Sequence, residues 1–169
     1  MEVTIRTARF SDLEDIYSVE TSCFPKQFQI SYDYYKRALE VYPEHFFLLF
    51  VDHKLAGLIN AMPTNKKDLS DSMLECMADY VKDGKFLMVI GLMVRPEFQH
   101  QGYAARLMKR LIRVARDEGR KSIVLTCRKE LIDFYKSFGY TYQGISASVL
   151  GDEVWHQLRL DLDDDDDYQ

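Results

Sequence analysis

The segment QHQGYA, residues 99–104, lies between an apolar run and a long amphipathic stretch. The run at 86–94 predicts a strand, and residues 102–119 place apolar side chains at helical spacing. The first amides of a helix have no partner within the helix, and the helix dipole makes that end positive. A glycine lets a bulky anion approach the backbone closely. The segment is therefore a candidate cradle for a phosphate or pyrophosphate group.

This loop differs from two common phosphate-binding motifs. No Gly-Lys-Ser/Thr sequence follows it, as one would in a P-loop, and it lacks the further glycines of a dinucleotide-binding fingerprint. A lone glycine between a strand and a helix is more often an ordinary structural turn. The meaning of the loop therefore depends on the elements around it.

The residues that commonly bind metals do not form a recognisable site. The chain has four scattered histidines, His45, His53, His100 and His156. It also has three widely spaced cysteines, Cys23, Cys76 and Cys127. Neither set has the spacing of a zinc site, and an odd number of cysteines does not indicate a disulfide framework. We expect no metal, and reduced thiols in the cytoplasm.

The surrounding elements predict a mixed fold. Strands are expected at 2–8, 46–52, 54–62, 85–94, 121–127, 140–151 and 153–162. Helices are expected at 11–24, 32–42, 71–81, 102–119 and 130–139. Ser31 is a candidate N-cap of the second helix, and Asp52-His53 predicts a hairpin turn. This order indicates an α+β or α/β fold on a mostly antiparallel sheet.

Composition restricts the class of function. A length of 169 residues fits one domain, expected at 1–162, and the net charge of −5 argues against a nucleic-acid surface. The longest apolar run is too short to span a bilayer, and the first residues lack a signal-peptide pattern. We therefore expect a cytoplasmic protein with no nucleic-acid or membrane partner. Residues 163–169 are expected to form a disordered acidic tail.

The loop and its context resemble the GCN5-related N-acetyltransferase (GNAT) superfamily. QHQGYA is similar to the family signature Q/R-x-x-G-x-G/A, and GLMVRPEF, residues 91–98, resembles the strand that precedes it. LTCRKELIDFYKSFGY, residues 125–140, resembles the fifth strand and the helix that follows. The resemblance covers residues 2 to about 162. The segments at 19–25, 42–62 and 125–160 are most similar to arylalkylamine N-acetyltransferases and their bacterial relatives.

This resemblance implies a GNAT fold with acetyl-CoA as co-substrate. That fold has a mostly antiparallel mixed sheet of about seven strands, flanked by about four helices and splayed between strands 4 and 5. In the family the loop binds the pyrophosphate of acetyl-CoA, and the fourth strand pairs with its pantetheine arm. The implied cofactor-binding residues are Leu92, Met93, Val94, Gln99, His100, Gln101, Gly102, Tyr103, Ala104 and Phe134.

Acetyl transfer to an amine requires a neutral nitrogen and a proton for the departing thiolate. An alkylamine with a pKa near 10.4 is neutral in only about one molecule in 2,500 at pH 7, so deprotonation costs roughly 4 to 5 kcal/mol. A general base therefore helps. The resemblance assigns the general acid to Tyr135. Met88 and Ile90 replace the two strand histidines of the vertebrate arylalkylamine enzymes, so the base is not identified.

Several residues are candidates for the acceptor side. Glu20 lies in the helix that lines this side in the family, and it could contact the amine. Four aromatic residues of the first two helices could wall an apolar pocket, namely Phe24, Phe28, Tyr32 and Tyr34. Asp79, Asp83 and His100 are alternative bases, although surface roles suit them better. Trp155 is expected in the core.

The sequence predicts an acyltransferase that moves an acetyl group from acetyl-CoA to a primary amine by direct attack. A small (aryl)alkylamine or polyamine is the expected acceptor. The alternatives are a protein N-terminus or lysine as acceptor, or a non-catalytic coenzyme A-binding module. Many relatives of this fold dimerise, so a homodimer is one expected state.

Overall fold

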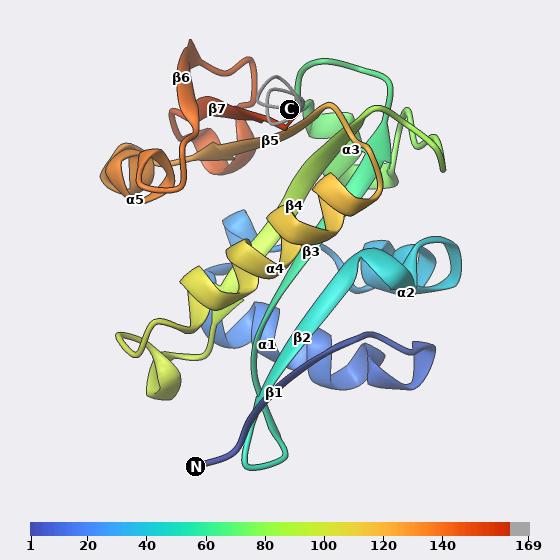
Figure 1. The fold of residues 1–169 in the computed structure, drawn as a ribbon, viewed down its shortest axis with the longest axis vertical. Helices are drawn as coiled ribbons and strands as arrows, with labels where there is room; N and C mark the ends of the chain where they lie inside the picture. The colour runs from blue at the N-terminus through green and yellow to red at the C-terminus, as the bar shows by residue number, and fades with distance from the viewer. Residues whose placement is uncertain (163–169) are drawn as a thin grey trace, which may run out of the picture.

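The computed structural model describes residues 1–162, and the predicted acidic tail lies outside the described residues. A seven-stranded sheet has the order β1-β2-β3-β4-β5-β7-β6 (Figure 1). The strands are β1 (Val3–Thr7), β2 (Phe46–Val51), β3 (Lys54–Thr64), β4 (Phe86–Val94), β5 (Ser122–Cys127), β6 (Thr141–Ile145) and β7 (His156–Asp161). The α-helices are α1 (Leu13–Cys23), α2 (Tyr32–Val41), α3 (Asp71–Cys76), α4 (Tyr103–Asp117) and α5 (Ile132–Lys136). The predicted α+β class is confirmed.

The sheet divides between β4 and β5. These two strands form its parallel pair, and their pairing covers only residues 86–88 with 122–124. Within the described residues, β4 has no strand partner on its β5 side from Val89 onward, while β5 continues to pair with β7. The predicted splay between the fourth and fifth strands is therefore present.

A β-bulge in β4 lies where the two strands separate. Asn60 of β3 pairs with Gly91, and Ala61 pairs with Val89, so Ile90 is an extra residue in β4. A bulge bends its strand and increases the local twist. The bend therefore follows directly after the last parallel pair and directs the rest of β4 away from β5.

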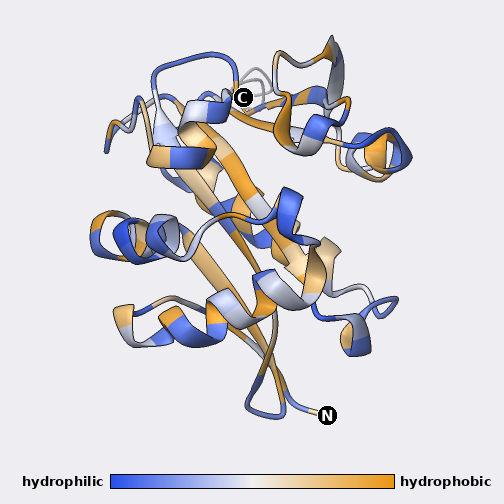
Figure 2. Cartoon of the chain, turned by 180° about the vertical axis from the view of Figure 1, so that it is seen from behind, coloured by the Kyte–Doolittle hydropathy of each residue, from blue (hydrophilic) through white to orange (hydrophobic). Residues whose placement is uncertain are grey.

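Helices cover both faces of the sheet. On one face, α1 and α2 pack against the strands through a cluster that includes Ile16, Tyr35 and Met88. On the other face, α4 packs through a cluster that includes Leu107 and Leu111 (Figure 1). The central strands are mostly hydrophobic, whereas the helices alternate between hydrophobic and hydrophilic residues (Figure 2). This alternation is the amphipathic pattern of helices that pack on a sheet.

Local signals account for several element boundaries. The Ser31 hydroxyl accepts a hydrogen bond from Tyr34 N at 3.0 Å, which confirms the predicted N-cap of α2. Asp52 and His53 have positive φ angles, as a tight turn between β2 and β3 requires. The helix predicted at 71–81 was too long, because Met77 adopts a left-handed conformation and ends α3 at Cys76.

Candidate active site

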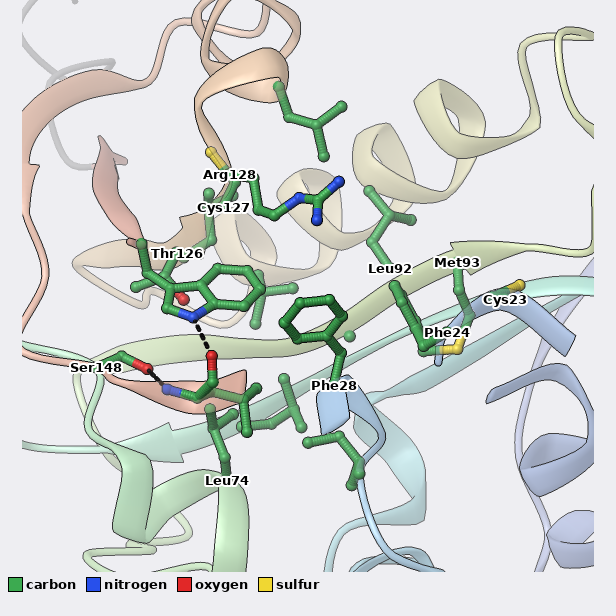
Figure 3. Close-up of a pocket in the computed structure, with 18 of the residues that line it drawn as sticks. Cys23, Phe24, Phe28, Leu74, Leu92, Met93, Thr126, Cys127, Arg128 and Ser148 are labelled. Atoms are coloured by element: carbon green, nitrogen blue, oxygen red, sulfur yellow. Dashed lines mark hydrogen bonds between the residues drawn. The ribbon is translucent and has the colours of Figure 1, made fainter. Parts of the chain in front are cut away.

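The splay opens into a cavity of about 430 Å³ (Figure 3). Its walls come from α1, the short 3-10 helix η2 (Lys26–Phe28), β4, the end of β5, α5 and the 3-10 helix η6 (Leu150–Asp152). Most lining residues are apolar or aromatic. Within the described chain, the charged residues of the lining are Glu20 and Arg128. An apolar cavity with a few polar groups is typical of a small-molecule site.

Glu20 is a fully buried carboxyl group in the cavity wall, near the end of α1. It accepts hydrogen bonds from Ile30 N, at 3.1 Å, and from the Tyr35 hydroxyl. Burial raises the pKa of the Glu20 carboxyl, and these two hydrogen bonds oppose the rise. A carboxylate with a raised pKa is a stronger base, so it is better suited to taking a proton near neutral pH.

A second buried acceptor lies behind the cavity wall. Asn60 is fully buried, and its Oδ1 atom has no hydrogen-bond partner within the described chain. A Cβ placed on Gly91 would lie 3.3 Å from Asn60 Oδ1 and 3.8 Å from the Tyr35 hydroxyl, but only 2.5 Å from Met93 Cε. The Met93 methyl group therefore fills the space at Gly91 and covers both oxygen atoms. Of these three groups, Glu20 is the one that lines the cavity and can accept a hydrogen bond from an amine.

Tyr135, the predicted proton donor, lines the cavity from the other face of the sheet. It belongs to the cluster under α4, whereas Glu20 comes from α1. Its ring contacts Phe134 and Tyr140, with centroid distances of 5.1 and 6.0 Å. Burial raises the pKa of the Tyr135 hydroxyl, and Cys127 adds to the rise. The hydroxyl therefore stays protonated at neutral pH and can donate a proton.

The loop at 99–104 connects β4 to α4. Gly102 is the N-cap residue of α4, with a φ of 84° and no side-chain capping bond. This left-handed angle favours glycine, although no atom lies within 4 Å of a Cβ built there. Gln99 Nε2 donates to Val94 O at 3.0 Å and so holds the loop against β4. The loop therefore presents the amides at the start of α4 to solvent without a competing side-chain cap.

The other predicted cofactor-binding residues lie in β4, in α5 and within the loop itself. Leu92 and Met93 line the cavity, whereas Phe134 packs against Phe138 and Tyr135 outside the set of lining residues. Within the loop, Tyr103 is buried beneath α4. The exposed loop positions are Gln99, His100, Gln101 and Gly102, and Ala104 is half-buried.

The acceptor-side predictions separate into two groups. Phe24 and Phe28 line the cavity together with Glu20. Tyr32 and Tyr34 do not line it, so half of the four aromatic candidates pack elsewhere. Tyr32 donates to exposed Glu14 at 2.5 Å, and Tyr34 is buried with its hydroxyl 2.7 Å from that of Tyr42.

Three candidate bases lie elsewhere. Asp79 and Asp83 are exposed in the segment before β4, and neither lines the cavity. His100 is exposed in the loop at 99–104 and is also absent from the cavity wall. These placements leave Glu20 as the carboxyl group that lines the cavity within the described chain.

Sequence reasoning missed part of the cavity wall. Trp155 was expected in the core, but it precedes β7 and lines the cavity, edge-on to Phe28 at a centroid distance of 5.9 Å. Arg128 was not singled out, although it follows β5 directly at the splayed end of the sheet. The available signal for Arg128 was a charged residue directly after a predicted strand, at the splayed end of the sheet.

The thiols and histidines provide no alternative chemistry at this site. Burial raises the pKa of the Cys127 thiol to about 11, so it stays protonated and is a poor nucleophile. Across residues 1–162, no group of three or more histidine, cysteine, aspartate or glutamate side chains could hold a metal ion.

Within residues 1–162, no helix combines the length and apolar character needed to cross a membrane.

A family model described as the acetyltransferase (GNAT) family matches residues 13–140. The chain belongs to this family. It is therefore an acyltransferase with the fold that binds acyl-coenzyme A, as the loop and the splayed strands indicated. The finer resemblance to arylalkylamine enzymes is not confirmed by the comparisons and stays a prediction.

Solved structures show the same fold at low identity. The loading GNATL domain of CurA from Lyngbya majuscula aligns with a TM-score of 0.85, at 15% identity over 96% of this chain and 98% of that chain. The GphF GNAT-like decarboxylase in complex with isobutyryl-CoA aligns at 0.83, with 19% identity over 94% and 99%. The ribosomal-protein-S18-alanine N-acetyltransferase from Escherichia coli aligns at 0.70, with 20% identity over 95% and 94%. A comparison with curated protein sequences found no match.

The residues of this GNAT chain fit acetyl-CoA. The edge of β4 beyond residue 88 has backbone groups without a strand partner, which can pair with the amides of a pantetheine arm. The start of α4 offers amide donors for a pyrophosphate. Arg106, close to the start of α4, is exposed and adds positive charge at this end of the helix.

Proposed function

We propose that this GNAT enzyme is an acetyl-CoA-dependent N-acetyltransferase whose acceptor is a small primary amine. The buried carboxyl group of Glu20, which lines the cavity and has a raised pKa, supports the proposal most directly. Ile30 N and the Tyr35 hydroxyl donate to this carboxyl group and hold it in place. An aryl- or alkylamine or a polyamine would donate an N–H group to it.

The acceptor part of the cavity is narrow at Phe28, which favours a small acceptor. η2 and η6 meet there, and a Cβ built on Gly151 would overlap the ring of Phe28. The edge-on contact between Phe28 and Trp155 narrows the same region. An amine with a modest apolar body fits such a space better than a folded protein surface does.

The chain's own groups then have defined roles. Acetyl-CoA supplies the acetyl group as a thioester. Glu20 takes a proton from the acceptor nitrogen, directly or through one water, so that the neutral amine attacks without an acyl-enzyme. Tyr135 gives its proton to the departing sulfur. The amides at 99–104 and the open edge of β4 orient the cofactor, in a setting that we propose is cytoplasmic because the three cysteines are free thiols.

The test is the release of coenzyme A thiol over a panel of amines. Tryptamine, phenethylamine, polyamines, lysine and short peptides are each incubated with acetyl-CoA, and the acetylated product is identified by mass spectrometry. Turnover with at least one small amine is the expected result. Turnover with peptides alone would contradict the proposal and favour a protein acceptor, as in the S18-alanine enzyme among the structural relatives.

Two further measurements distinguish N-acetyltransfer from other functions of the same fold. Binding of acetyl-CoA by calorimetry, with no turnover on any amine, would favour a coenzyme A-binding module. Carbon dioxide release from malonyl-CoA without amide formation would indicate chemistry like that named for the GphF relative. Either result would overturn N-acetyltransfer.

A further inference from the structure

We propose that the acceptor amine also carries a carboxylate group, which Arg128 binds at the mouth of the cavity. This inference rests on the proposed N-acetyltransferase function and narrows its substrate class. The acceptor is then an amino acid-like molecule, with its nitrogen near Glu20, its carboxylate near Arg128 and an apolar body between them.

Arg128 faces the acceptor half of the cavity. It follows β5 in an extended conformation, with φ −78° and ψ 161°, so the alternation of side chains along the strand continues through it. Val124 belongs to the cluster under α1 and α2, whereas Leu125 and Cys127 belong to the cluster under α4. Thr126 and Arg128 are therefore on the Val124 side, which is the side of α1 and Glu20.

The guanidinium group of Arg128 is positioned over the cavity by an aromatic ring. Its Cζ atom lies 5.6 Å from the centroid of the Phe28 ring, a cation–π contact. In Figure 3 the side chain extends from the end of β5 above Phe28 and toward Leu92. Phe28, Leu92 and Arg128 all line the cavity, and Arg128 is itself exposed, so its positive charge lies where the cavity meets solvent.

The present partners of Arg128 are exchangeable. Its terminal nitrogens lie 3.4 Å from Glu130 and 3.4 Å from Glu153, both of which are exposed. Exposed ion pairs of this kind contribute little, on the order of 0 to 1 kcal/mol. A guanidinium group has five N–H donors in a planar fork that matches a carboxylate. A carboxylate inside the cavity can therefore replace these contacts with a bidentate pair.

The Thr126 hydroxyl is a further donor of the wall on the Arg128 side. Trp155 Nε1 donates to Leu150 O at 2.8 Å, and the Ser148 hydroxyl donates to Asp71. The Thr126 hydroxyl lines the cavity two residues before Arg128, on the same side of the strand. Thr126 and Arg128 together provide the neutral and the cationic donor that a carboxylate requires.

The charge arrangement of the cavity supports a doubly charged ligand. Glu20 and Arg128 are the charged residues of its described lining, and Phe28, Leu150 and Trp155 form apolar wall. An amine without an anionic group would pair with Glu20 but not with Arg128. An amino acid whose apolar body separates its amine from its carboxylate complements the acidic, apolar and basic parts together.

The experiment compares matched amines with and without a carboxylate. Benzylamine is paired with 4-(aminomethyl)benzoate, and pentylamine with 5-aminopentanoate, and kcat/KM is measured for each with acetyl-CoA. We expect at least one carboxylated amine to exceed its parent by roughly tenfold. Arg128→Gln should remove this ratio, Arg128→Lys should restore part of it, and Lys129→Gln, which removes a neighbouring exposed charge, should preserve it.

A binding measurement separates this inference from the proposed function. The affinities of 3-phenylpropanoate and 3-phenylpropan-1-ol are measured by calorimetry on coenzyme A-loaded wild-type protein and the Arg128→Gln variant. Selective carboxylate binding that needs Arg128, without turnover on any amine, would support the anion site while N-acetyltransfer fails. Amine turnover with no carboxylate preference, or a preference unchanged by Arg128→Gln, would overturn the inference and leave the function intact. An Arg128 effect confined to malonyl-CoA would also overturn it, because the carboxylate would then belong to the acyl chain.

Discussion

The cofactor loop and the acceptor wall are built in different ways. The loop at 99–104 uses main-chain amides and two left-handed backbone angles, at His100 and Gly102, all within six consecutive residues. The wall around Glu20 uses side chains from α1, η2, β4 and β5, which are far apart in the sequence. Under the proposed function, recognition of the cofactor is therefore encoded locally, whereas recognition of the acceptor depends on tertiary contacts. The two functions can consequently change independently.

The largest expected effect comes from Glu20→Gln. A glutamine can still accept from Ile30 N and donate to the Tyr35 hydroxyl, so both hydrogen bonds are retained while the base is lost. We expect kcat to fall roughly 1,000-fold, within the range for general-base removal, with little change in acetyl-CoA affinity. Steady-state kinetics and calorimetry measure the two quantities.

The matched control is Glu14→Gln, on the exposed face of the same helix. It removes one negative charge from α1 without touching the cavity wall, so kcat should stay near the wild-type value. A similar kcat for Glu20→Gln and Glu14→Gln would limit Glu20 to a structural role.

The next effect in size is expected for Tyr135→Phe. The departing thiol has an ordinary pKa near 8.5, so it needs less help than the amine, and we expect kcat to fall about 100-fold. The ring contacts with Phe134 and Tyr140 are preserved by phenylalanine, so thermal stability should change little. An unaltered kcat in single-turnover experiments would remove Tyr135 from proton transfer.

A smaller effect is expected on the cofactor side, from Gly102→Val. A β-branched residue at a φ of 84° is strained by roughly 1 to 3 kcal/mol, which should distort the start of α4 and raise KM for acetyl-CoA about tenfold. Gly119→Val is the control, because Gly119 has a φ of 73° with no atom near its missing Cβ, at the other end of α4. Both variants should lose similar thermal stability, and an equal rise in KM in both would contradict a specific role for the loop.

The subtlest expected effect is on the pH profile. Glu20 acts as a base only when ionised, so kcat falls as pH decreases through its pKa. Because burial raises this pKa, the fall should occur at higher pH than for an exposed carboxyl group. The Tyr35 hydroxyl stabilises the ionised form, so Tyr35→Phe should move the acidic limb to still higher pH. A limb that does not move, measured at saturating substrates, would show that another group is titrating.

The sequence predicted the parts of the molecule whose signals are local. The Ser31 cap and the turn at Asp52 and His53 were confirmed, because each depends on a few neighbouring residues. Trp155 was wrongly expected in the core, because strand alternation does not apply to a residue that precedes β7 and packs edge-on against Phe28.

Two features of the acceptor wall were not accessible from sequence at all. The close packing at Gly91, where a Cβ would overlap Met93 Cε, depends on a bulge in one strand and on Asn60 of its neighbour, which are brought together only by the register of β3 and β4. The apposition of Glu20 and Arg128 around one cavity requires the packing of η2 against the end of β5. Such relationships involve long-range contacts that periodicity does not report.

The extra residue in β4 also reverses the alternation of side chains along that strand. Before Ile90, odd-numbered residues such as Leu87 and Val89 face α4, whereas after it the even-numbered Leu92 and Val94 do so. Deleting a single residue at this point would exchange inward and outward positions along the whole outer half of the strand. Insertions and deletions in relatives that keep this cavity should therefore avoid β4 and accumulate in the surface turns. An alignment that places a gap within β4 would assign the wrong residues to the cavity even where the overall fold is matched correctly.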